Sequence, residues 1–101
     1  MLPLSTIQER MAKLNNWALE GESIVKDFVF QGFLESVWFV NKVAEIAEKE
    51  QHHPDIIINY NNVRLVSTTH SERGLTSKDF DLAEKIDKIG KEENKTESTA
   101  N

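Results

Sequence analysis

The feature that most constrains the fold is an amphipathic segment at residues 33–50, near the middle of the chain. Its apolar residues recur at steps of three and four, the spacing that puts side chains on one face of an α-helix: Phe33, Val37, Val40, Ala44 and Ala47. His52-His53-Pro54 follows, and a proline both lacks the N–H that a helix needs and disfavours the α conformation of the residue before it. The sequence therefore predicts a long helix that ends beside two histidines.

Short runs of strand-forming residues lie on both sides of this helix. They predict four strands, at 17–20, 23–30, 55–60 and 63–69. Gly21-Glu22 joins the first pair, and alternation along 23–30 gives an amphipathic pattern typical of an edge strand. Asn61-Asn62 joins the second pair, because asparagine tolerates the positive φ that a two-residue turn requires. We expect two antiparallel hairpins.

Two further helices are predicted near the ends of the chain. Thr6 and Glu9 have the spacing of a capping box and predict a helix over 7–14. Thr76 and Asp79 repeat that spacing before a helical stripe that predicts a helix over 77–89: Phe80, Ala83, Ile86 and Ile89. The fold class is then α+β, in the order α-β-β-α-β-β-α, with a four-stranded antiparallel sheet covered on one face by helices.

A chain of 101 residues has room for one modest core, which we assign to a single domain over 1–90. The polar segment 91–101 cannot offset its own ordering entropy, and it is predicted to be a disordered tail.

Composition narrows the classes of function. The chain has no cysteine, so disulfides, thiolate nucleophiles and zinc–thiolate sites are excluded. Seventeen acidic against twelve basic residues give a net charge of −5, which disfavours direct binding to nucleic acid or to anionic membranes. No apolar run is long enough to span a bilayer and no leader pattern is visible, so we expect a cytoplasmic protein.

The three histidines, His52, His53 and His70, all stand at the ends of predicted elements. Imidazole titrates at about pH 6.5, so such a cluster can hold both proton donors and proton acceptors near neutral pH. Glu48 precedes His52 by four residues and could orient its ring if the helix continues that far.

Other interpretations of these residues remain open at this point. A histidine at a helix end can simply interact with the helix dipole, and His-His-Pro can be no more than a helix stop. Glu48, His52 and His70 could formally bind a metal, but no HExxH-type spacing is present and no metal site is predicted. On local grounds Asp79 is a helix cap and Trp17 a core residue.

The paired histidines and the residues after them resemble the signature of the pterin-4a-carbinolamine dehydratases. The resemblance rests on the run 48–54 (EKEQHHP), followed by Tyr60, Val63, Thr69-His70, Gly74-Leu75-Thr76 and Asp79. Trp17 stands where that family has a tryptophan before its first hairpin, and the family has the same element order. The resemblance covers about 17–89, nearly all of the predicted domain.

The resemblance implies dehydration of a 4a-hydroxytetrahydropterin to the quinonoid dihydropterin, the recycling step after aromatic amino acid hydroxylation, without metal or organic cofactor. It makes His52 and His70 the acids at the hydroxyl, while His53 binds the pterin or acts as the base. It assigns a second group of residues to substrate binding or to support of the histidines: Glu48 behind His52, Asp79 near His70, Trp17 in the pocket wall, and Pro54.

Two residues bear on substrate preference. Ile56 stands where many family members have an aromatic residue, so a wall contact with the pterin is weakened here. Arg73 is a candidate contact for a polar pterin tail or a solvated loop residue.

The resemblance leaves other functions open. They are a protein-interaction module of the dimerisation or coactivator type, which animal members also are, and action on a molybdopterin-related pterin. An amphipathic helix over one small sheet also leaves apolar surface, so a homodimer or homotetramer is expected.

Overall fold

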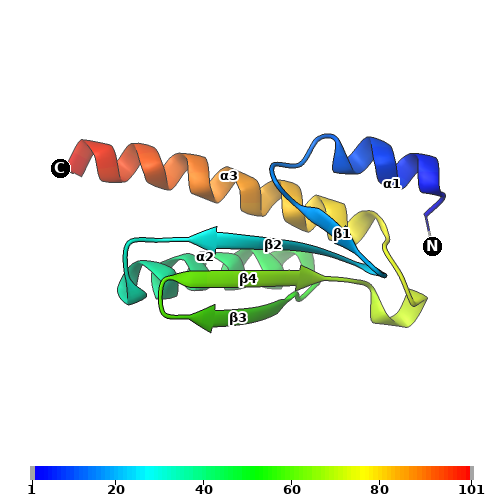
Figure 1. Ribbon diagram of the computed structural model, residues 1–101, viewed down its shortest axis with the longest axis horizontal. Coiled ribbons are helices and arrows are strands. Elements are labelled where there is room, and N and C mark those ends of the chain that lie inside the picture. The colour runs from blue at the N-terminus through cyan, green and yellow to red at the C-terminus, as the bar shows by residue number, and fades with distance from the viewer. Residues whose placement is uncertain (1, 101) are drawn as a thin grey trace.

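The computed structural model describes residues 2–100, with side chains described for 2–89. The elements are α1 (Leu4–Met11), β1 (Ala18–Glu20), β2 (Ser23–Val29), α2 (Phe33–Glu50), β3 (Asp55–Asn59), β4 (Asn62–Ser67), the short 3₁₀ helix η1 (His70–Glu72) and α3 (Ser77–Ala100), as Figure 1 shows. The predicted α+β class and element order are confirmed. α3 continues beyond the expected end at residue 89 to Ala100. The side chains of 90–101 lie outside the described part, and the disorder predicted for 91–101 stays a prediction.

The four strands form one antiparallel sheet in the order β1-β2-β4-β3. β2 is therefore an interior strand, and the edge-like interpretation of 23–30 is wrong. The alternation along 23–30 resembles that of an edge strand because β1 pairs only with Ser23 to Val25. The rest of β2 has a strand neighbour on the β4 side alone.

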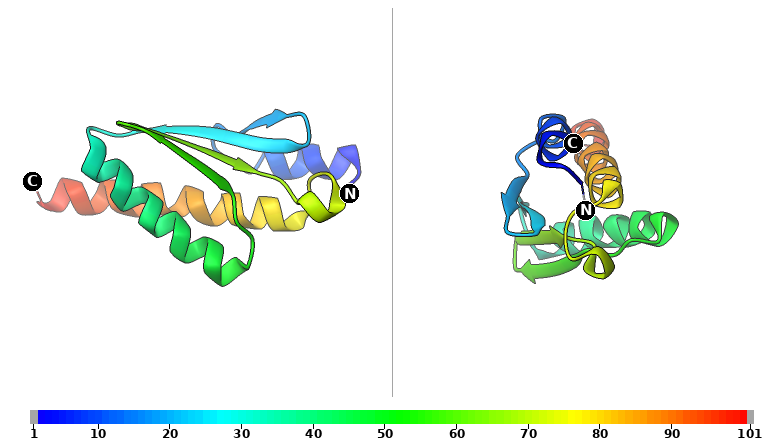
Figure 2. Two further views of the ribbon diagram at one scale, coloured as in Figure 1. Left: turned by 90° about the horizontal axis from the view of Figure 1, so that it is seen from below. Right: turned by 90° about the vertical axis from the view of Figure 1, so that its right-hand side faces the viewer.

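One face of the sheet carries the core (Figure 2). Strand alternation turns Ile24, Val63 and Leu65 inward, where they are fully buried against the helices. α2 and α3 pack against each other beneath the sheet, and α1 lies beside α3 at the β1 end. The stripe predicted for the last helix is buried throughout: Phe80, Ala83, Ile86 and Ile89.

The ends of the helices determine where the histidines lie. α2 has the predicted bounds, and Gln51 then takes a left-handed conformation with φ 52°. The His52 N–H donates to the Ala47 carbonyl at 3.1 Å, which satisfies a carbonyl of the last turn and turns the chain away from the helix axis. Both histidines are therefore outside the helix.

The two predicted capping boxes have different outcomes. Thr76 caps α3 as predicted, since its hydroxyl accepts from the Lys78 N–H at 3.3 Å and Asp79 accepts from the Thr76 N–H at 2.9 Å. α1 instead runs from Leu4 to Met11 with Pro3 at the N-cap, so Thr6 lies inside the helix and both expected bounds, 7 and 14, are wrong. Proline fits this position because an N-cap residue has an extended backbone, here with φ −64° and ψ 154°.

One turn also differs from the prediction. Asn59 pairs with Asn62, which leaves Tyr60 and Asn61 as the loop between β3 and β4, and Tyr60 takes the positive φ of 52°. In the turn after η1, Arg73 takes a positive φ of 54°. Within the described residues, none of the helices combines the length and apolarity needed to cross a bilayer.

Candidate active site

The three histidines line one open pocket of about 350 Å³, at the low end of the roughly 300–1,000 Å³ typical of small-molecule sites. The pocket forms where α2 ends, β4 ends and α3 begins, because the turn at Gln51 and the η1 segment bring these ends together. Its lining is polar: Gln51, His52, His53, Thr68, Thr69, His70, Ser71 and Lys78.

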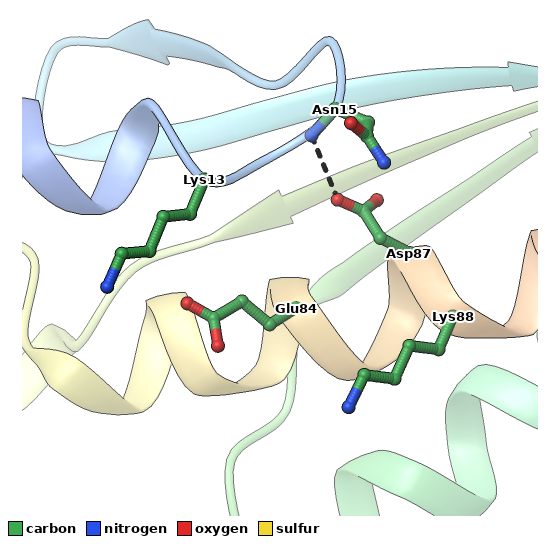
Figure 3. Close-up of a pocket in the computed structure, with 5 residues that line it drawn as sticks. All are labelled: Lys13, Asn15, Glu84, Asp87 and Lys88. Atoms are coloured by element: carbon green, nitrogen blue, oxygen red, sulfur yellow. Dashed lines mark hydrogen bonds between the residues drawn. The ribbon is translucent and has the colours of Figure 1, made fainter.

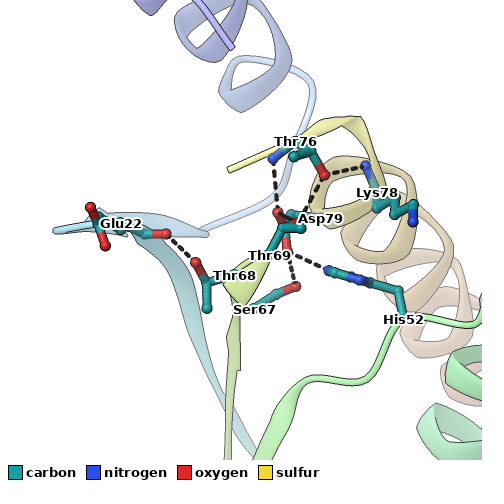
Figure 4. A network of polar contacts seen from close by, with 8 residues as sticks. All are labelled: Glu22, His52, Ser67, Thr68, Thr69, Thr76, Lys78 and Asp79. Atoms are coloured by element: carbon teal, nitrogen blue, oxygen red, sulfur yellow. Dashed lines mark hydrogen bonds and ion pairs between the residues drawn. The ribbon is translucent and has the colours of Figure 1, made fainter. Parts of the chain in front are cut away.

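A fully buried carboxylate, Asp79, bonds to two residues that line this pocket, His52 and Thr69 (Figure 4). It lies in the first turn of α3 and is surrounded by four donors. Its Oδ1 accepts from His52 Nε2 at 2.7 Å and from Ser67 Oγ at 2.6 Å, and its Oδ2 accepts from Thr69 Oγ1 at 2.8 Å and from the Thr76 N–H at 2.9 Å. One side chain thus ties together the ends of α2, β4 and α3, and a buried carboxylate with this many donors is well satisfied.

His52 is held by this carboxylate. Its side chain is only 11% exposed, and its Nε2 faces a carboxylate oxygen that can only accept when ionised, so Nε2 carries the proton. The nitrogen that remains for proton exchange with a ligand is Nδ1.

His53 has a different partner and a different environment. Its Nε2 lies 2.6 Å from Glu48 Oε2, and both side chains are largely exposed. The expected contact between Glu48 and His52 does not form, because α2 ends at Glu50 and the reversal at Gln51 places the next histidine against Glu48 instead.

His70 begins η1 and is exposed on the wall of the pocket. Asp79, expected near His70, bonds to the adjacent Thr69 and also to His52. None of the hydrogen bonds within residues 2–89 involves the His70 ring. The pocket thus contains one imidazole on a buried carboxylate, one on an exposed carboxylate, and one free of protein partners among the described residues.

Trp17, expected in the pocket wall, lies elsewhere. It is 8% exposed, belongs to the core, and donates from Nε1 to Asp87 Oδ1 at 2.8 Å. Asp87 also accepts from Lys26 Nζ at 3.0 Å and from the Asn15 N–H at 3.0 Å, so it fastens the first hairpin and the α1 loop to α3.

Asp87 borders a second pocket of about 260 Å³, which Figure 3 shows between the end of α1 and α3. It is lined by charged or amide side chains: Lys13, Asn15, Glu84, Asp87 and Lys88. This pocket has no imidazole, and its most buried acid is already engaged by the contacts described above. We therefore place the candidate site at the histidines.

Three further predicted residues do not line the histidine pocket. Pro54 is partly buried and leads from His53 into β3. Ile56 packs against the core. Arg73 is exposed in the turn after η1.

Sequence reasoning missed several residues of the site. Ser67 and Thr69 reach Asp79 from β4 and its end, and Gln51 and Lys78 line the pocket. The Thr69-His70 step and the Thr76 cap signalled where these elements end, but only the fold shows that the ends meet. Among the side chains of 2–89, no three histidine or acidic groups converge in the manner of metal ligands.

Comparison with known proteins decides the family. The profile of the family described as pterin 4 alpha carbinolamine dehydratase matches residues 2–89. The chain belongs to this family. A relative from Sulfolobus acidocaldarius, provisionally named pterin-4-alpha-carbinolamine dehydratase, is 47% identical over 83 residues, which are 82% of this chain and 91% of the relative. One with the same provisional name from Chloroflexus aurantiacus is 49% identical and covers 82% and 89%.

Solved structures agree with the fold of this dehydratase family. A protein from Brucella melitensis, described as a transcriptional coactivator/pterin dehydratase, has a TM-score of 0.82 at 36% identity, covering 87% of this chain and 96% of that one. A pterin dehydratase-like RuBisCO assembly factor of the alpha-carboxysome has a TM-score of 0.60 at 16% identity over 73% of this chain and 86% of that one, a likeness of fold alone.

Proposed function

We propose that this protein dehydrates 4a-hydroxytetrahydropterins to quinonoid dihydropterins and so recycles the cofactor of aromatic amino acid hydroxylases. The observation that carries the proposal is the convergence of His52, His53 and His70 on one polar pocket in a chain of the dehydratase family.

The chemistry suits imidazoles. The lone pair of N5 forms the N5–C4a double bond as the C4a–oxygen bond breaks. The departing hydroxyl takes a proton from an acid and leaves as water, and N5 gives its proton to a base. Each proton transfer is worth roughly 10²–10⁴-fold when a group is positioned for it. The scheme needs side chains and water alone.

The surroundings of each histidine support a division of roles. His70 has no protein partner within the described residues and acts as one acid at the hydroxyl. His52 acts as the other through Nδ1 when both ring nitrogens carry a proton, since Nε2 is bonded to Asp79 and the carboxylate balances the charge of that form. His53, oriented by Glu48, binds the pterin or accepts the N5 proton. Pro54 fixes the chain after His53, and Trp17 supports the fold through the core and Asp87.

The test is the rate of dehydration with substrate generated in situ by an aromatic amino acid hydroxylase. We expect the parent to accelerate the reaction and the His52→Ala/His70→Ala variant to lose roughly 10²–10⁴-fold or fall to the uncatalysed background. Asn41→Ala, at an exposed position of α2 away from the pocket, is the control and keeps parental activity. A folded parent that gives no acceleration, or a double variant with full activity, would refute the proposal.

Self-association is a second part of the proposal. Leu34 is 83% exposed and Phe33 51% exposed at the start of α2, and Val29 at the end of β2 is 72% exposed. Apolar side chains gathered at one end of a small domain favour burial against another subunit, in a homodimer or a homotetramer. Leu34→Glu should lower the mass measured by light scattering, while Asn41→Glu, a more polar position on the same helix, serves as control. A monomeric parent would contradict this part.

The same surface is where a coactivator-type partner would bind, a role that the description of the Brucella melitensis protein includes. The other alternative is action on a molybdopterin-related pterin. It would be favoured if the protein dehydrates such a pterin and does not dehydrate a 4a-hydroxytetrahydropterin with a simple side chain. In each case we place the protein in the cytoplasm and expect no direct contact with nucleic acid or membrane.

A further inference from the structure

Lys78 is a pocket residue that the proposed chemistry does not use. It is the one Lys or Arg among the residues that line the histidine pocket, and it lies in the first turn of α3, next to Asp79. Figure 4 shows its side chain on the same side of Asp79 as the His52 ring. The ion pairs formed within residues 2–89 engage other cations, namely Arg10, Lys26, Arg64 and Lys85, and leave the Lys78 ammonium without a carboxylate partner there.

The two carboxylates that bond to the histidines form no ion pair with this ammonium. Asp79 is fully buried and already accepts four hydrogen bonds, and Glu48 is paired with His53. None of the residues that line the pocket is acidic. A protein with a net charge of −5 therefore presents, at its candidate site, a cation that a ligand can neutralise.

We infer that Lys78 selects pterins whose C6 side chain carries an anionic group, a carboxylate or a phosphate. The inference rests on the proposed function and names the substrate class of the same site. C4a, N5 and C6 are consecutive atoms of the pterin ring, so histidines that act at C4a and N5 stand beside the C6 substituent. A cation that lines the same pocket is then within reach of that substituent, since the lysine side chain is long and flexible.

The reaction itself favours the same placement. Positive charge develops on N5 and C4a as the hydroxyl departs, and a bare ammonium nearby would oppose it. An anionic side chain that pairs with Lys78 removes this repulsion. It also gives binding energy that a neutral side chain lacks.

The expected gain in affinity from the ion pair is modest because the pocket is open to solvent. An exposed ion pair is worth up to about fivefold in affinity and weakens as salt is added. Lys78 is a specificity residue in this account, and the imidazoles remain the groups that move protons.

The experiment is a fluorescence titration with two stable pterins, 6-carboxypterin and 6-hydroxymethylpterin, which differ in the charge of the C6 substituent. We expect the parent to bind the carboxylate more tightly, with a preference that falls as ionic strength rises. Lys78→Gln should lose about fivefold in affinity for 6-carboxypterin and keep its affinity for 6-hydroxymethylpterin. Lys49→Gln, an exposed lysine of α2 outside the pocket lining, is the matched control and should change neither.

The outcomes separate this inference from the proposed function. Equal affinity of the parent for both pterins, or an unchanged preference in Lys78→Gln, overturns the role of Lys78 and leaves the dehydratase proposal standing. Failure of the parent to bind either pterin, together with failure to accelerate dehydration, overturns both.

Discussion

Replacement of Asp79 tests the structure of the site most severely, because one buried carboxylate holds three elements together. In Asp79→Ala, the Thr69 hydroxyl still has the Thr76 hydroxyl at 2.8 Å. The Ser67 hydroxyl, the His52 ring N–H and the Thr76 backbone N–H lose their acceptor. Three unsatisfied donors at about 1–3 kcal/mol each predict a loss of about 3–9 kcal/mol, a large part of the roughly 5–15 kcal/mol by which a small domain is stable.

Asp79→Asn tests the effect of the carboxylate on the dehydration rate separately from its effect on the stability of the fold. If the amide nitrogen replaces Oδ1, the Ser67 hydroxyl can rotate to accept from it, and His52 can accept at Nε2 by moving its proton to Nδ1. The bonds from Thr69 and from the Thr76 N–H are kept. The stability loss should then be only about 1–3 kcal/mol, the difference between charge-assisted and neutral hydrogen bonds. The neutral amide cannot balance the charge of a His52 ring protonated on both nitrogens, the form that donates from Nδ1, so the dehydration rate should fall by roughly 10²–10⁴-fold.

The assays are urea unfolding followed by tryptophan fluorescence, and the dehydration rate per folded molecule. A loss below about 0.5 kcal/mol in Asp79→Ala would refute the network as drawn, because four buried bonds cannot be removed at so small a cost. Full activity of a folded Asp79→Asn would refute the role of the Asp79 charge in the acid function of His52.

Three other perturbations have defined outcomes. Tyr60→Asn should raise stability by up to about 1 kcal/mol in urea unfolding, since Tyr60 takes a φ of 52° that asparagine adopts more readily and its side chain is 62% exposed; a loss would show that its ring makes stabilising contacts. Trp17→Phe should cost about 2 kcal/mol, by removing the 2.8 Å bond to Asp87, and leave the rate per folded molecule unchanged; a lowered rate would put Trp17 at the pterin. Hydrogen bonds from Arg64 hold the pKa of the Asp27 carboxyl below its usual 3.8. This pair therefore stabilises the fold above that pH and less as pH falls through the lowered pKa, so the stability gap between parent and Asp27→Asn should close in acid, and a gap that persists there would contradict the assignment.

The elements were predictable where their signals are local. α2 has the bounds that its three–four periodicity and the His-His-Pro step predict, and the buried stripe of α3 follows from its sequence spacing. Clustering of the three histidines was suggested by their place at element ends. Thr76 caps its helix through atoms within three residues, so its spacing was sufficient.

The partners of these residues were not predictable, because they depend on how distant elements pack. Glu48 and His52 are four apart, which suggested a pair, but the left-handed Gln51 breaks that spacing and Glu48 meets His53. Asp79 has a local role as a cap, and its second role at His52 arises only when α3 packs beside the end of α2. The bond between Trp17 and Asp87 likewise joins residues 70 positions apart.

The most direct test of the central claim is to follow the three histidine rings by ¹⁵N NMR while a 7,8-dihydropterin is added. The account predicts that the signals of His52, His53 and His70 all shift and saturate at one dissociation constant. It also predicts that His52 shows protonation at Nε2 before pterin is added, as its 2.7 Å contact with Asp79 requires. Saturable binding that leaves all three rings unchanged and instead shifts the backbone signals of Asn15 and Asp87 would place the pterin in the second pocket and contradict the account.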